Sequence, residues 1–145
     1  MKKLKLVKAE ESDKNFLIGL RKSTMIEHLE KAGIYLSEEQ HISRVNFKYE
    51  NTYLIYTSNQ KVGMLKYIEN ENSIEILQLQ IIPDYQGLGI GKRIINQVTD
   101  ICKISNKILT LKVLKENPAK HLYQNIGFTI VGEDQHEFFM ELLPA

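Results

Sequence analysis

The stretch Ile81–Val98, IIPDYQGLGIGKRIINQV, contains the most informative pattern in the chain. An apolar segment ends at a proline, glycines follow at every second position, and Lys92 and Arg93 then open an apolar pattern with helical spacing. Glycine adopts positive φ angles and lets the backbone approach a ligand closely. A helix start offers free N–H donors and a partial positive charge. The stretch therefore predicts a cradle for a phosphate or pyrophosphate between a strand and a helix.

Three other interpretations of the glycines fit the sequence less well. A glycine-rich turn that only packs a strand on a helix would need neither three alternating glycines nor two cations. A Walker A loop requires Ser or Thr after its Gly-Lys pair, whereas Gly91 and Lys92 are followed by Arg93. A dinucleotide fingerprint has unevenly spaced glycines after the first strand of a βαβ unit, and here the strand follows an antiparallel hairpin. The phosphate cradle remains the favoured interpretation.

Length and composition narrow the class of protein. The chain has 145 residues, the size of one domain, and a net charge of +1, which gives no reason to expect a nucleic-acid binder. Its one cysteine, Cys102, excludes an intrachain disulfide and is expected to pack in the core. With no signal peptide and no apolar run of membrane-spanning length, we expect a cytoplasmic protein without a membrane or metal partner.

Hydrophobic periodicity and turn residues predict a mixed sheet flanked by helices, with βαβ character in the middle. Strands are expected at Leu4–Lys8, Thr52–Thr57, Val62–Ile68, Ile74–Ile82, Ile108–Leu114, Phe128–Val131 and Glu137–Leu142. A first helix should begin near Ser12 or Asp13 and end at Gly33, and Ser37 should cap a second that runs toward Phe47. Two further helices are expected from about Gly91 to Cys102, and from Asn117-Pro118 to Gly127.

These patterns resemble a known family. Gln86–Gly91, QGLGIG, matches the Q/R-x-x-G-x-G/A motif of the GCN5-related N-acetyltransferases, the GNAT superfamily. Ile81–Tyr85 is typical of that family's fourth strand and its turn, and Asn117–Phe128 resembles the segment that ends in L-Y-x-x-x-G-F. The resemblance implies an α/β fold, one domain over residues 1–145, and a mostly antiparallel sheet of about seven strands that splays between the fourth and fifth.

The resemblance implies acetyl-coenzyme A as co-substrate and assigns residues to it. The amides of the glycine loop would bind the pyrophosphate, with Gln86 and Gly87 shaping the turn; the loop residues are Leu88, Gly89, Ile90, Gly91, Lys92 and Arg93. The backbone of the fourth strand at Leu79, Gln80 and Ile81 would pair with the pantetheine arm. One amide there would meet the thioester carbonyl and stabilise an oxyanion. Asn117 would cap its helix and contact the pantetheine, and Lys120 would meet the phosphates.

Two residues are candidates for proton transfer. Tyr123 matches the family's general acid, which protonates the departing thiolate; its alternative role is a core tyrosine beside Leu122. Glu75 is the candidate base, because its interval to Gln86 equals that of the catalytic glutamate in histone-acetylating members. Strict alternation would place Glu75 on one face with Leu77, Leu79 and Ile81, where its pKa could be raised. The alternatives are a solvent-exposed glutamate and deprotonation of the amine through ordered water.

The acceptor pocket of relatives is built by the first helices and the last hairpin, here residues 21–36 and 133–137. Candidate residues there are Arg21, Thr24, Glu27, His28, Tyr35 and His136. Arg21 could bind a substrate carboxylate, and Glu27 and Glu30 could attract a cationic amine. The acceptor is expected to be a small-molecule or peptide amine that attacks directly in a ternary complex. A non-catalytic acyl-CoA-binding module and an enzyme for longer acyl chains stay as alternatives, and a homodimer is compatible with the terminal hairpin.

Overall fold

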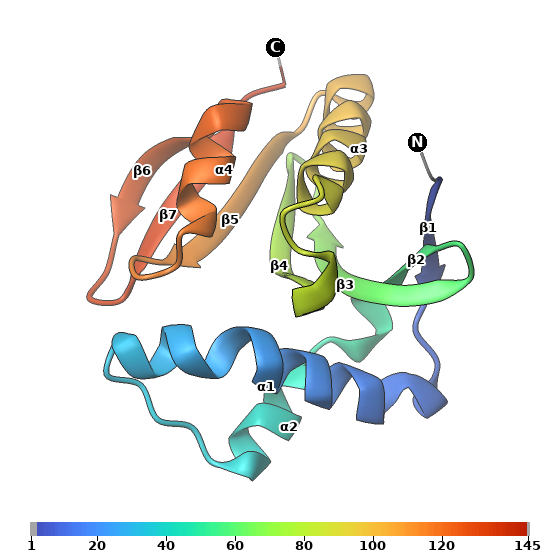
Figure 1. The fold of residues 1–145 in the computed structure, drawn as a ribbon. Helices are drawn as coiled ribbons and strands as arrows, with labels where there is room; N and C mark the ends of the chain where they lie inside the picture. Colours follow the sequence, from blue (N-terminus) through green and yellow to red (C-terminus); the bar gives the residue numbers. More distant parts are fainter. Residues whose placement is uncertain (1–2, 145) are drawn as a thin grey trace.

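The computed structural model describes residues 3–144. Strand β4 (Ser73–Ile81) lies in the middle of its sheet (Figure 1). The strand order is β1-β2-β3-β4-β5-β7-β6. The remaining strands are β1 (Leu4–Lys8), β2 (Thr52–Thr57), β3 (Gln60–Glu69), β5 (Ile108–Leu114), β6 (Thr129–Glu133) and β7 (Glu137–Leu142). The helices are α1 (Lys14–Lys31), α2 (Glu38–Asn46), α3 (Ile90–Ser105) and α4 (Ala119–Ile126). This order of elements is the predicted one, and α3 extends beyond its predicted end.

Local sequence signals explain where the helices begin. At α2, Gln40 N donates to Ser37 Oγ (3.2 Å) and Ser37 N donates to Gln40 Oε1 (2.8 Å), which is the predicted capping box. At α4, Asn117 Oδ1 accepts a hydrogen bond from Ala119 N at 2.9 Å. The helix begins at Ala119, one residue later than predicted, with Pro118 as its N-cap residue. Asn117 thus satisfies an amide of the first turn, as expected of a capping side chain.

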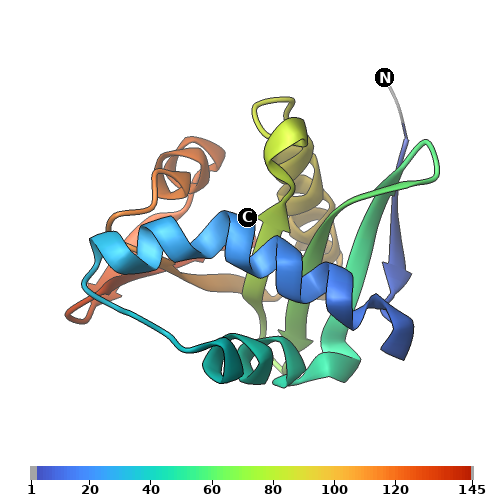
Figure 2. The same cartoon turned by 60° about the horizontal axis from the view of Figure 1, so that its bottom comes forward.

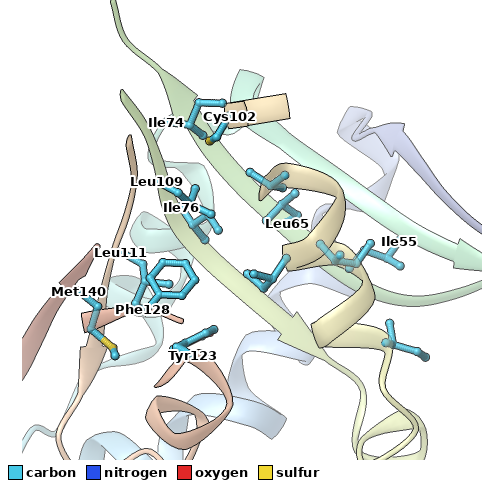
Figure 3. Close-up of a cluster of buried hydrophobic side chains, with 14 of the residues drawn as sticks. Ile55, Leu65, Ile74, Ile76, Cys102, Leu109, Leu111, Tyr123, Phe128 and Met140 are labelled. Carbon is cyan, nitrogen blue, oxygen red and sulfur yellow. The ribbon is translucent and has the colours of Figure 1, made fainter. Parts of the chain in front are cut away.

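The helices cover both faces of the sheet (Figures 1 and 2). Helices α3 and α4 pack on one face in a large apolar cluster, part of which Figure 3 shows, and Cys102 is buried in it as predicted. Helices α1 and α2 pack on the opposite face in a smaller cluster around Leu17, Leu20 and Val45. Within residues 3–144, none of the helices combines the length and the apolar character needed to cross a bilayer.

The sheet opens between β4 and β5, as predicted. This pair is parallel and extends over four residue pairs, from Ser73 opposite Ile108 to Ile76 opposite Leu111. All other neighbouring strands are antiparallel. Residues 77–81 of β4 continue along β3 without a β5 partner among the described residues. Peptide groups on that edge are therefore free to pair with another chain or a ligand.

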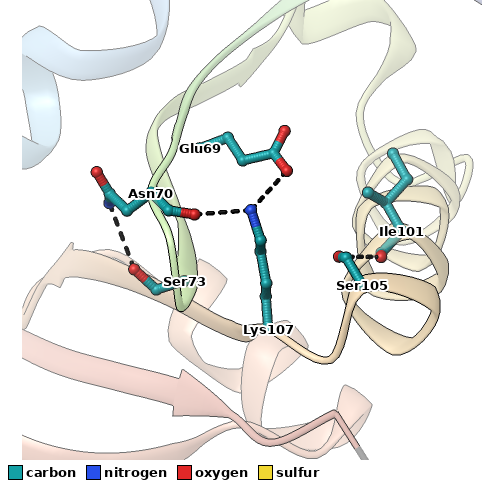
Figure 4. A network of polar contacts seen from close by, with 6 residues as sticks. All are labelled: Glu69, Asn70, Ser73, Ile101, Ser105 and Lys107. Carbon is teal, nitrogen blue, oxygen red and sulfur yellow. Dashed lines mark hydrogen bonds and ion pairs between the residues drawn. The ribbon is translucent and has the colours of Figure 1, made fainter.

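The closed end of this pair is fixed by Lys107, which precedes β5 (Figure 4). Its Nζ donates to Glu69 Oε2 and to Asn70 O, each at 2.7 Å. The backbone adds a bond from Ile108 N to Asn72 O at 3.1 Å. Since Glu69 ends β3 and Asn70 follows it in the β3–β4 turn, these bonds tie the end of β3 and the turn to the start of β5. They set the register from which the two strands diverge.

A β-bulge corrects the prediction that Glu75 shares a face with Leu79 and Ile81. Ile76 is paired with Tyr67 and Gln78 with Lys66, so Leu77 is an extra residue in the strand. An extra residue shifts the side-chain alternation by one position. As a result Ile74 and Ile76 contact the same apolar cluster as Leu79 and Ile81. Glu75, adjacent to Ile74 and Ile76, belongs to the opposite face.

Gly63 of β3 lies against the open half of β4. A Cβ atom at this position would stand 2.4 Å from the backbone oxygen of Gln80 and 3.0 Å from Ile81 Cδ1. No side chain can be accommodated at 2.4 Å from a backbone atom unless one of the strands moves. A glycine is therefore required here for the close approach of β3 to β4.

We expect Gly63→Ala to lower the free energy of unfolding by about 2 kcal/mol, because the added methyl group overpacks the β3–β4 contact. Gly19→Ala is the matched control, since Gly19 lies inside α1 and a Cβ there meets nothing within 4 Å. That variant should gain about 0.5–1 kcal/mol from helix propensity. Urea denaturation measures both; equal effects of the two substitutions would contradict the close approach at Gly63.

Candidate functional site

Two pockets lie along the open half of β4. The glycine-loop pocket, of about 440 Å³, is bounded by the end of β4 and the starts of α3 and α4. The hairpin pocket, of about 350 Å³, is bounded by α1, α2, β5 and the β6–β7 turn. The side chains that line both are Met25, Leu79, Gln80, Asn117 and Tyr123. The two pockets therefore meet beside the part of β4 that has no β5 partner.

The glycine loop is shaped by backbone conformation. Gly87 has φ +77° and Gly89 has φ +83°, and a Cβ at either position would meet nothing within 4 Å. Left-handed backbone, not crowding, thus explains these two glycines. Gly91 has no positive φ, and its Cβ would make an ordinary 3.7 Å contact with Leu122 Cδ2. Gln86 Nε2 donates to Ile81 O at 2.9 Å, which holds the loop to the end of β4.

Helix α3 presents its first turn to this pocket. Gly89 is the N-cap residue and has no side chain to accept a hydrogen bond from the following amides. The bond from Arg93 N to Gly89 O, at 3.0 Å, is the first of the helix. The amides just before it lack intrahelical acceptors and carry the positive end of the helix dipole. Gly91 and Lys92 line the pocket at this point, so the site suits a phosphate or pyrophosphate.

Tyr123 of α4 is 8 % exposed and lines both pockets. Its ring packs against Phe128 at a centroid distance of 5.8 Å, which fixes its position. Burial raises the pKa of its phenol to about 12. The group is therefore neutral at physiological pH and acts as a hydrogen-bond donor, not as a base. Both roles considered for Tyr123, core packing and a donor at the pocket, are compatible with this position.

Most of the predicted cofactor residues come together in the structure. Those that line the glycine-loop pocket are Leu79, Gln80, Ile81, Gln86, Gly87, Gly89, Ile90, Gly91, Lys92 and Asn117. Leu88 and Arg93 do not line it, and Leu88 is 66 % exposed. Lys120 is also outside, because its Nζ donates to Lys115 O at 3.2 Å and lies 5.2 Å from the centroid of the Phe138 ring. These contacts direct Lys120 toward β5 and β7.

Glu75 lines neither pocket. It pairs with Ile68 on one side and with Thr110 of β5 on the other, within the closed part of the sheet. The bulge at Leu77 places it on the face opposite Leu79 and Ile81. The geometry thus gives Glu75 no direct access to the junction of the two pockets.

The hairpin pocket contains charges of both signs. The cations are Arg21 of α1, Arg44 of α2 and Lys112 of β5, and the acidic groups are Asp134 of the β6–β7 turn and Glu137 at the start of β7. Burial raises the pKa of Glu137, with a smaller contribution from the negative charge of Asp134. Sequence analysis did not single out Arg44 or Glu137, because an arginine on a polar helix face and a glutamate beside a turn have no distinctive pattern.

The six acceptor candidates separate in the structure. Arg21 and His136 line the hairpin pocket. Thr24 and His28 line the glycine-loop pocket. Glu27 is instead paired with Lys31 at 3.2 Å on the outer face of α1, and Tyr35 is 73 % exposed. Neither of these two lines a pocket.

Comparison with known proteins agrees with the geometry. Residues 48–130 match the family model described as "Acetyltransferase (GNAT) domain". Spermidine N(1)-acetyltransferase of Escherichia coli K12 is 32% identical over 96 residues, which are 63% of this chain and 52% of that protein. N-alpha-acetyltransferase 50 of Danio rerio is 30% identical over 81 residues, which are 53% of this chain and 47% of that protein. The match thus spans about half the length of these curated relatives.

Solved structures share the fold over nearly the whole chain. PaiA N-acetyltransferase from Thermoplasma acidophilum, solved with coenzyme A, has a TM-score of 0.76 at 22% identity and covers 97% of this chain and 99% of its own. The spermidine/spermine N-acetyltransferase SpeG from Vibrio cholerae has a TM-score of 0.70 at 26% identity, and the match covers 97% of this chain and 94% of that protein's chain. These likenesses confirm the predicted fold class.

We expect the Tyr123 phenol to stay protonated at pH 10, since burial raises its pKa to about 12. In a protein with ¹³C-labelled tyrosine Cζ, the Tyr123 resonance should keep its position up to about pH 11. The same protein in urea provides the reference, because unfolded tyrosines ionise near pH 10. A midpoint at or below 10 for the folded Tyr123 resonance would contradict the burial of its hydroxyl. Tyr123→Phe assigns the signal.

Proposed function

Because the chain belongs to the GNAT acetyltransferases, we propose that it transfers the acetyl group of acetyl-CoA to a primary amine of a small molecule or peptide. The reaction would proceed by direct attack in a ternary complex. One observation carries this proposal: two separate pockets meet at Leu79, Gln80 and Tyr123. A thioester in one pocket and an amine in the other would touch only at this junction. Direct transfer requires that arrangement.

The glycine-loop pocket fits acetyl-CoA in two respects. The amides at the start of α3 and Lys92 supply donors and charge for the pyrophosphate. The open edge of β4 over residues 77–81 offers peptide groups that can pair with the amides of a pantetheine arm. Both features line the same pocket, at Gly91 and Lys92 for α3 and at Leu79 to Ile81 for β4. An elongated ligand with phosphates at one end therefore fits better than a compact anion.

The transfer step needs few groups from the protein. A bond forms between the amine nitrogen and the acetyl carbon, the carbon–sulfur bond breaks, and the sulfur receives a proton. Tyr123 lies at the junction as a neutral phenol and would donate its hydrogen to the sulfur. A backbone N–H on the open edge of β4, near Leu79 and Gln80, would stabilise the charge that develops on the carbonyl oxygen.

The proton that the amine loses would pass to water in the open hairpin pocket. We prefer this route to Glu75, because Glu75 lines neither pocket and lies in the closed part of the sheet between Ile68 and Thr110. Among the described residues, Cys102 is no candidate for a covalent intermediate, since it is 2 % exposed within the apolar cluster and burial raises its pKa.

We expect Gly89→Asp to weaken acetyl-CoA binding by about 100-fold or more, because a carboxylate would occupy the anion cradle at the start of α3. Gly33→Asp is the matched control: Gly33 has φ +79°, its Cβ would also meet nothing within 4 Å, and it lies at the end of α1. Titration calorimetry with acetyl-CoA compares the two. Unchanged affinity for acetyl-CoA in a folded Gly89→Asp protein would contradict the assignment of the anion site to the start of α3.

Tyr123→Phe should lower kcat for thiol release by about 100-fold and leave the KM for acetyl-CoA within about twofold, because only the proton donor is lost. The assay follows thiol release from acetyl-CoA with a panel of amines. Tyr56→Phe, a tyrosine outside both pockets, is the control. No release with any amine, despite tight binding of acetyl-CoA, would favour a binding module; release only from longer acyl-CoAs would favour another donor.

A further inference from the structure

Arg21 is a buried cation without an acidic partner. It is 4 % exposed and lines the hairpin pocket. Its Nε donates to His41 Nδ1 at 3.1 Å, and no carboxylate within residues 3–144 forms an ion pair with it. Burial and the charge of Arg44 lower its pKa to about 10, so it stays protonated at neutral pH. A buried guanidinium is costly unless an anion accompanies it.

Two further cations increase the positive charge around Arg21. Arg44 of α2 lines the same pocket and is exposed to solvent. Lys66 of β3 is 1 % exposed and donates to the oxygens of Val45 (3.0 Å) and Phe47 (2.5 Å) at the end of α2. These carbonyl oxygens accept the hydrogen bonds of the Lys66 ammonium group. Lys66 therefore adds positive charge without offering hydrogen-bond donors to the pocket. Arg21 and Arg44 keep the groups that a ligand could contact.

The hairpin side of the pocket contains acidic groups. Asp134 Oδ1 accepts hydrogen bonds from His136 N at 2.9 Å and Glu137 N at 2.7 Å, which fixes the β6–β7 turn. Glu137 is half-buried and lines the pocket. The positive charges of Lys112 and, to a smaller extent, Arg44 act on Glu137. The pocket is thus basic toward α1 and α2, whereas its hairpin side combines Asp134 and Glu137 with Lys112 of β5.

We propose that the acceptor is an amino carboxylate, whose carboxylate binds Arg21 and Arg44 while its amine reaches the junction at Tyr123. This rests on the proposed function and names its substrate class. A planar guanidinium binds both oxygens of a carboxylate side by side. The pocket also has apolar lining residues, Met25, Leu29, Ile34 and Leu36. The pocket therefore combines an anion site with an apolar surface, which fits an amino acid with an apolar side chain.

The test uses pairs of acceptors that differ only in the carboxylate: leucine against leucinamide, and methionine against methioninamide. The amide keeps the amine, the side chain and nearly the same size. Its amine is the less basic of the two and is more deprotonated at neutral pH. A preference for the free acid therefore cannot come from the reactivity of the amine. Spermidine is included as an acceptor that has amines and no anion.

We expect kcat/KM for the free acids to exceed that for the amides by about tenfold or more, the size of a charge-assisted hydrogen bond. Arg44→Gln should remove most of this preference by lowering the value for the acids and leaving the amides within about twofold. Lys103→Gln removes a charge from the exposed surface of α3 and is the matched control. Arg44 is chosen because loss of the buried Arg21 would also leave His41 without its donor.

Other outcomes separate this inference from the proposed function. If leucinamide or spermidine is acetylated at least as fast as leucine, the proposed carboxylate-binding site is overturned. The proposed acetyltransferase activity is then still supported. An equal effect of Arg44→Gln on acids and amides would do the same. If no amine is acetylated, calorimetry with the coenzyme A complex decides: binding of leucine, weakened at least about tenfold in leucinamide and in Arg44→Gln, supports the anion site. Equal binding of both ligands overturns it.

Discussion

The fold depends on one constraint, the short parallel pairing of β4 with β5. Four residue pairs join these strands, and Lys107 holds their closed end through Glu69 and Asn70. Parallel strands need a crossover, and α3 supplies it. Because both strands run toward the open end, the starts of α3 and α4 lie there too. The free edge of β4, the anion cradle and Tyr123 thus come together as a consequence of topology.

The two faces of β4 differ in chemistry, and the bulge at Leu77 determines which side chains each face receives. On the α3 side, Ile74, Ile76, Leu79 and Ile81 contribute to a continuous apolar core. On the α1 and α2 side the buried groups include charged ones, chiefly Lys66. Burial lowers the pKa of Lys66 to about 8, and the carbonyls at the end of α2 compensate it. One face stabilises the sheet, and the other gives the neighbouring pocket its charge.

Sequence predicted what local signals encode. The capping box at Ser37, the alternation of strands and the conformational demand of Gly87 and Gly89 each act within a few residues. The bulge at Leu77 carries no such signal, because an extra apolar residue in an apolar strand does not reveal where the side-chain alternation shifts. The face of Glu75 was predicted wrongly for that reason. The charge balance of the hairpin pocket was also hidden, because it arises between elements far apart in the sequence.

The family match does not extend to the charged residues of the hairpin pocket that we propose bind the acceptor. The matched residues 48–130 include the open half of β4, the glycine loop and Tyr123, to which the proposed function assigns acetyl-CoA. Arg21 and Arg44 precede this range and Glu137 follows it. The relatives' names therefore inform the donor side of the reaction more than the acceptor side. A buried guanidinium without a protein anion is a property of this chain, and it constrains the acceptor more directly than likeness to a spermidine acetyltransferase does.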